Sequence, residues 1–144
     1  MTMGDAENGL SFHHVGYVVA SIQQAAAGFV GSLALKWDGR IIHDPLQTVC
    51  VSFFHPHSAG SPAIELVEPV GAGSPVHRFL ERGGGLHHVC FEVDSLERQL
   101  ERTKANRDVI VRSPAPAVAF DGRRIAWIYT KDKLLVEYLE KCLK

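Results

Sequence analysis

Two histidines and two glutamates recur at matching places in the two halves of the chain. His14 and His88 lie 74 positions apart, and Glu65 and Glu137 lie 72 positions apart. Two imidazoles and two carboxylates form a donor set that suits Zn, Ni, Co, Mn or Fe(II) and leaves positions open for water or substrate oxygens. We therefore predict that these four residues bind one divalent metal ion.

Each of these histidines is the second of a doubled pair in an apolar segment. Successive residues of a strand face opposite sides, so only one histidine of each pair can point into a given space. His87 shares its parity with the apolar Val89, which leaves His88 to face a cavity, and the same reasoning selects His14 over His13. A single strand histidine is more often structural, but recurrence at equivalent places favours a functional role.

The two glutamates lie inside apolar segments, between Ile64 and Leu66 and between Val136 and Tyr138. A carboxylate that faces an apolar core costs several kcal/mol unless it is paired or bound to a metal. The alternative is that both face solvent, which we accept for the strand-end residues Glu68 and Glu140. The match across the repeat favours metal binding for Glu65 and Glu137.

The elements that must position these residues repeat as well. Residues 12–19 resemble residues 86–93, each segment is followed by a serine and a helical stretch, and residues 64–68 match residues 136–140. Each copy predicts a strand, a helix and three more strands, which is an α+β fold. The predicted helices cover about 22–33 and 96–105, and the later strands cover about 38–43, 48–55, 62–68, 108–113, 124–130 and 134–140.

Local signals predict how these elements begin and end. Ser21 with Gln24 can form a capping box for the first helix, and Asp94 with Glu97 can do so for the second. A short helix is expected to start at Ser74-Pro75 and run through Leu80, before a triplet of glycines. The proline-rich residues 113–116 cannot continue a central strand, so they predict an edge or a loop.

These signals predict one domain made of two modules. We expect a flexible N-terminus over residues 1–10 and a single domain over residues 11–144. Within the domain, modules at 11–70 and 85–141 are joined by a short helical linker at 74–82.

The composition excludes several classes of function. The chain has 15 basic and 16 acidic residues and a net charge of −1, so no basic surface predicts nucleic-acid binding. Three cysteines without metal-finger spacing indicate thiols in a reducing compartment. The N-terminus has no apolar segment, and no run approaches the ~18–20 apolar residues of a membrane helix. We expect a soluble cytoplasmic protein that binds no membrane.

Several segments resemble the vicinal oxygen chelate superfamily, which contains glyoxalases, bleomycin-resistance proteins and dioxygenases. The segments that carry the resemblance are residues 12–16, 64–69, 74–75, 85–89, 122–126 and 135–137. The resemblance covers nearly all of residues 12–140 and implies the glyoxalase fold, in which two βαβββ modules form a U-shaped metal-binding cavity. The family's four ligand positions fall on His14, Glu65, His88 and Glu137. We also expect a homodimer.

Within the superfamily the pattern is most similar to methylmalonyl-CoA epimerases and to bacterial glyoxalase I-like proteins (lactoylglutathione lyases). This implies a metal-dependent isomerase or lyase that moves a proton at the carbon next to a carbonyl. The substrate would be a CoA thioester or a glutathione hemithioacetal, with Glu137 as the first base and Glu65 as the second. Epimerases typically have glutamine where this chain has Glu65, and Val51 occupies the position of their additional glutamate base.

Other interpretations remain open. His14, His88 and Glu137 alone would suit an Fe(II) extradiol-type dioxygenase, which a catechol-type activity needing oxygen would reveal. A non-catalytic small-molecule-binding protein of the bleomycin-resistance type would lack the metal, and a duplicated domain with an inactive site would use its cavity only for dimerisation. Four basic residues could approach the phosphates of a CoA thioester, although solvated strand-end charges are the simpler interpretation. They are Arg123, Arg124, Lys131 and Lys133.

Overall fold

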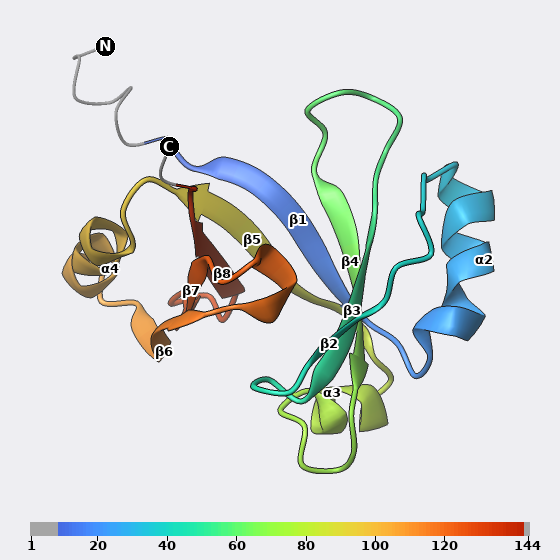
Figure 1. Ribbon diagram of the computed structural model, residues 1–144. Coiled ribbons are helices and arrows are strands. Elements are labelled where there is room, and N and C mark those ends of the chain that lie inside the picture. Colours follow the sequence, from blue (N-terminus) through green and yellow to red (C-terminus); the bar gives the residue numbers. More distant parts are fainter. Residues whose placement is uncertain (1–8, 143–144) are drawn as a thin grey trace. The chain divides into compact units, whose positions relative to one another are not determined.

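A computed structural model describes residues 9–142 of the chain, and it divides into two compact units (Figure 1). The N-terminal unit comprises residues 14–87. The C-terminal unit comprises residues 88–142 together with residues 9–13. Apart from Gly9 and Leu10, the flexible N-terminus predicted over residues 1–10 lies outside the described residues.

The N-terminal unit is a four-stranded mixed sheet with one long helix packed against it. Its strands lie in the order β2-β3-β4-β1, where β1 runs parallel to β4 and the other neighbours are antiparallel. Helix α2 lies beside the sheet (Figure 1), where it contacts β3 and β4 and buries Ile22 and Ala26 against Phe54 and Leu66. The elements are β1 (Ser11–Val18), α2 (Ile22–Leu33), β2 (Ile42–Asp44), β3 (Val49–Phe54), β4 (Ala63–Pro69) and α3 (His77–Glu81).

The C-terminal unit repeats this arrangement. Its strands lie in the order β5-β8-β7-β6, with β5 parallel to β8 and the other neighbours antiparallel. Helix α4 buries Leu96 and Leu100 against Ala126, Ile128 and other residues of the sheet. The elements are β5 (Gly85–Val93), α4 (Leu96–Ala105), β6 (Val109–Pro116), the short 3-10 helix η1 (Val118–Phe120), β7 (Arg124–Tyr129) and β8 (Leu135–Glu140).

The predicted α+β fold of two βαβββ modules is confirmed, and both long helices have the predicted bounds. Strand β2 begins only at Ile42, whereas the prediction was 38–43, because the Ser52 side chain binds the segment that precedes it. The Trp37 indole Nε1 donates to Ser52 Oγ at 2.7 Å, and Ser52 Oγ donates to the Arg40 carbonyl oxygen at 2.5 Å. Residues 113–116 form the end of β6, the last strand in the order, so the predicted edge is confirmed.

One of the two predicted helix caps is wrong. Ser21 Oγ accepts from the Gln24 amide at 3.2 Å, as predicted. Helix α4 is capped by Ser95, whose Oγ accepts from the Arg98 amide at 3.2 Å. The Asp94 carboxylate instead lies 3.2 Å from Lys141 Nζ. Ser95 follows Ser21 by the same 74 positions that separate the two histidines.

The linker helix starts later than predicted. Residues Ser74 to Val76 form a turn in which the His77 amide donates to the Ser74 carbonyl, and α3 begins only at His77. After this helix the chain passes close to β1 at Gly84. A Cβ atom at this position would lie 2.7 Å from the Val18 carbonyl oxygen. The φ of Gly84, +68°, also favours glycine.

Two further predictions concern the chain as a whole. Among residues 9–142 no helix is both long and apolar enough to span a membrane. Cys50, Cys90 and Cys142 form no disulfide, as predicted. Burial, and secondarily the charge of Glu68, raises the pKa of the Cys50 thiol, so this thiol stays protonated near neutral pH.

Candidate functional site

The N-terminal unit brings His14 and Glu65 together. The Nε2 atom of His14 lies 3.5 Å from Glu65 Oε1, and the two residues are only 0% and 5% exposed. The parallel pairing of β1 with β4 places Gly16 opposite Glu65. His14 precedes Gly16 by two residues and so shares its face of the strand.

An aromatic ring that the sequence did not reveal completes this group. Phe53 lies opposite Glu65 in the antiparallel pair of β3 and β4. Its ring meets the His14 imidazole edge to face, with centroids 5.6 Å apart. The sequence predicted a strand over about 48–55, but only the strand register shows that Phe53 belongs with the His–Glu pair.

The C-terminal unit contains the equivalent group. The Nε2 atom of His88 lies 3.8 Å from Glu137 Oε1, and the two residues are 5% and 3% exposed. Trp127 lies opposite Glu137 across β7 and β8, and its ring meets the His88 imidazole edge to face at 4.7 Å. Trp127 follows Phe53 by 74 positions, so each unit holds one histidine, one glutamate and one aromatic residue in equivalent places.

The strand faces agree with the predicted parity. Val136 and Tyr138, which flank Glu137, belong to the core beneath α4, so Glu137 lies on the opposite face of β8. The doubled partners of the two histidines, His13 and His87, contact other aromatic rings. His87 meets Phe79 edge to face at 4.9 Å. His13 meets Phe120 in the same way at 5.5 Å.

The spacing within each His–Glu pair fits two ligands of one ion. Ligand atoms that each lie about 2.1 Å from a metal are about 3.0–3.4 Å apart at octahedral and tetrahedral angles. The distances of 3.5 and 3.8 Å exceed this by a few tenths of an ångström. Each unit therefore offers one imidazole and one carboxylate in a geometry that a divalent metal accepts with small adjustments.

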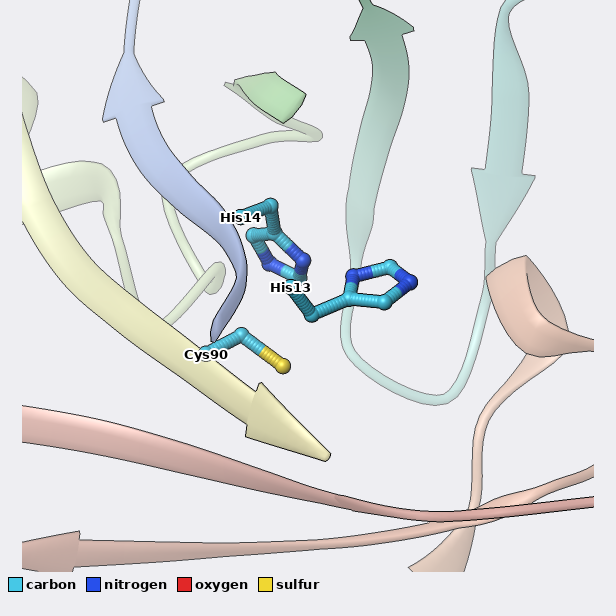
Figure 2. A group of neighbouring side chains, drawn as sticks. All are labelled: His13, His14 and Cys90. Carbon is cyan, nitrogen blue, oxygen red and sulfur yellow. The ribbon is translucent and has the colours of Figure 1, made fainter. Parts of the chain in front are cut away.

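Cys90 and His13 form a second group of potential ligands in the C-terminal unit. Their ligand atoms lie within 4.8 Å of each other, and Cys90 is fully buried. Figure 2 shows them with His14, the two histidines coming from β1 and the cysteine from β5. Two protein ligands from one unit are fewer than the three or four of protein zinc sites.

Arg123 and Arg124, which could have approached substrate phosphates, are engaged by carboxylates. Arg123 Nη1 lies 3.0 Å from Glu92 Oε2. Arg124 Nη2 lies 2.8 Å from Glu97 Oε1 and 2.7 Å from Glu140 Oε2. The hydrogen bonds that Arg124 donates to the Glu97 and Glu140 carboxylates raise its pKa, so its charge is satisfied within the protein.

Position 51 carries no group that could move a proton. Val51 is 5% exposed and lies between Ile42 and Val67 in the sheet. The nearby Asp44 is buried, but its carboxylate accepts from the amides of Leu46 and Gln47 and from the Gln47 side chain. Asp44 therefore stabilises the turn between β2 and β3.

The chain is similar to proteins of one superfamily. The family model described as Glyoxalase/Bleomycin resistance protein/Dioxygenase superfamily matches residues 13–127. The uncharacterized protein YqjC of Bacillus subtilis is 36% identical over 88% of this chain and 89% of its own length. Ethylmalonyl-CoA/methylmalonyl-CoA epimerase of Cereibacter sphaeroides is 30% identical over 83% and 88%. The solved methylmalonyl-CoA epimerase of Mycobacterium tuberculosis is 22% identical and has the same fold, with a TM-score of 0.80 over 92% and 89% of the two chains.

Proposed function

This chain belongs to the Glyoxalase/Bleomycin resistance protein/Dioxygenase superfamily, and on that premise we propose that it epimerises a 2-carboxyacyl-CoA thioester with the help of a divalent metal. The observation that carries the proposal is the buried His–Glu pair present once in each unit. The name of the Cereibacter sphaeroides relative supports this class of substrate.

The residues proposed to hold the metal are His14, Glu65, His88 and Glu137. When bound, the ion would supply Lewis acidity toward the oxygens of the substrate, which favours loss of a proton next to the carbonyl. Two neutral imidazoles and two carboxylates would also balance its positive charge.

Glu137 and Glu65 are the proposed acid–base pair. The Glu137 carboxylate takes the proton from the carbon between the carboxylate and the thioester, and the electron pair moves into the thioester carbonyl. Glu65, which would leave the metal and be protonated once the substrate is bound, then delivers its proton to the opposite face of that carbon. Because both side chains are almost fully buried, little water competes with the substrate for these carboxylates.

A second candidate is the glyoxalase I reaction on a glutathione hemithioacetal. It is favoured by Glu65, since the epimerases that this chain resembles typically carry glutamine there. In that reaction one carboxylate would move the proton between neighbouring carbons of the same substrate. The two candidates therefore share their residues and differ in the substrate.

Proton exchange in D₂O tests the proposal. Purified protein loaded with each metal is mixed with methylmalonyl-CoA or with the glutathione hemithioacetal, and deuterium uptake is followed by mass spectrometry. Glu137→Gln and Glu65→Gln should each reduce turnover about 100-fold or more, because each removes a proton-transfer group. The control is Glu101→Gln, which changes an exposed glutamate on α4.

The outcomes separate the candidates. Exchange with methylmalonyl-CoA alone supports the epimerase, and exchange with the hemithioacetal alone supports the second candidate. Absence of exchange with both substrates for every metal, or full turnover by Glu137→Gln, would refute the proposed proton transfer.

A further inference from the structure

Strand β6 contains a bulge that changes the direction of one arginine. Ile110 pairs with Ile128 of β7, and the next paired residue, Arg112, lies opposite Trp127. Two residues of β6 thus face one residue of β7, so Val111 is the additional residue of a β-bulge. Bulges re-aim side chains and occur often beside active sites.

The bulge places Arg112 on the face of the sheet opposite α4. Ile110 and Ile128 pack against the core beneath α4. In a regular strand Arg112, two residues after Ile110, would share that face and bring a charge to the apolar core. The register shift instead aligns Arg112 with Trp127, whose neighbours Ala126 and Ile128 are both in that core.

Arg112 therefore extends a row of side chains that begins at the proposed base. The row crosses three neighbouring strands, from Glu137 on β8 through Trp127 on β7 to Arg112 on β6. Adjacent strands are about 4.8 Å apart, so the backbones of Arg112 and Glu137 are separated by about 10 Å. A long arginine side chain on this face can approach a molecule that is in contact with Glu137.

No carboxylate within residues 9–142 neutralises this arginine. Arg123 and Arg124 are each held by glutamates, whereas Arg112 is exposed and makes no ion pair with a described residue. An arginine guanidinium presents paired donors that match both oxygens of a carboxylate. The row thus places a cation that is available to a ligand beside the proposed site of proton transfer.

We propose that Arg112 binds the free carboxylate of the acyl group and so selects 2-carboxyacyl thioesters over simple acyl thioesters. This rests on the proposed function, because in such a substrate the carboxylate is attached to the carbon whose proton Glu137 removes. Arg112 acts in binding and orientation of the substrate and takes no part in proton transfer.

The test measures binding and does not depend on turnover. Calorimetry gives the Kd of malonyl-CoA, of acetyl-CoA, which lacks the carboxylate, and of malonyl-pantetheine, which lacks the phosphates. Arg112→Met should weaken binding of both malonyl thioesters about 10–100-fold and leave acetyl-CoA binding unchanged, since a charged hydrogen bond is lost. The Arg112→Lys variant should recover part of the lost affinity. The control is Arg98→Met, which changes an exposed arginine of α4 and should leave the Kd of all three probes unchanged.

Three results would overturn the proposal. They are unchanged malonyl-CoA binding in Arg112→Met, an equal loss for acetyl-CoA, and a loss confined to the two CoA thioesters, which would assign Arg112 to the phosphates. Failure of the proposed function has a different signature, namely no proton exchange by the parent protein. In that case an Arg112-dependent preference for malonyl thioesters would still support the carboxylate site.

Discussion

Single residues show how each unit orients its histidine. The rings of His88 and Trp127 meet edge to face, and so do the rings of His14 and Phe53. Such contacts stabilise one ring orientation by about 0.5–1.5 kcal/mol beyond apolar burial. The aromatic residue beside each histidine thus limits the directions in which Nε2 can point.

Replacing Trp127 should consequently weaken metal binding without removing a ligand. We expect Trp127→Leu to lower metal affinity about 10-fold, the size of effect typical for residues that orient a ligand. Competition with a chromophoric chelator measures this affinity. Tyr129→Leu is the matched control, because Tyr129 lies two residues further along β7 and is 42% exposed. Equal affinities for Trp127→Leu and the parent protein would show that the ring does not orient His88.

At the scale of the elements, capping of α4 gives a direct test of local structure. Ser95→Ala removes the hydroxyl that accepts from the Arg98 amide and should lower the free energy of unfolding by about 1 kcal/mol. Asp94→Ala should lower it by at most about 0.5 kcal/mol, because the pair of Asp94 with Lys141 is exposed. Urea denaturation of both variants measures the difference. If Asp94→Ala lowered the free energy of unfolding more than Ser95→Ala, Asp94 would be the capping residue of α4.

Elements with a strong periodic pattern could be predicted from the sequence. Both long helices and the repeat of strands were predicted, because apolar spacing and the Ser21 cap of the first helix are local properties. The parity of the doubled histidines also placed His14 and His88 on the correct faces. These predictions needed only the alternation of residues within one strand.

Features that depend on pairing between strands could not be predicted. The positions of Phe53 and Trp127 opposite the two glutamates follow from register, as does the alignment of Arg112. The bulge at Val111 has no distinct signal in the sequence, because the same residues could equally form a regular strand. The helix cap of α4 is a different case, because Ser95 caps the helix locally and the Asp94 carboxylate lies near Lys141.

At the scale of the whole molecule, duplication gives each unit an incomplete set of donors. One imidazole and one carboxylate are two protein ligands, whereas protein sites for zinc generally use three or four. If the four residues bind a single ion, as we propose, its binding requires both units. Metal binding would then couple the stability of the two units.

This coupling predicts that loss of one histidine abolishes binding instead of halving it. The parent protein should contain one metal ion per chain, and His14→Ala and His88→Ala should each contain almost none. At a free metal concentration of about 100 times the Kd, the ion should stabilise the parent protein by about 2.7 kcal/mol. That corresponds to a rise in Tm of about 5–10 °C, which both variants should lack.

Elemental analysis measures the metal content, and thermal unfolding measures the rise in Tm. The control is His43→Ala, which changes an exposed histidine of β2. A variant that retains half of the metal, or the full rise in Tm, would mean that each unit binds metal independently.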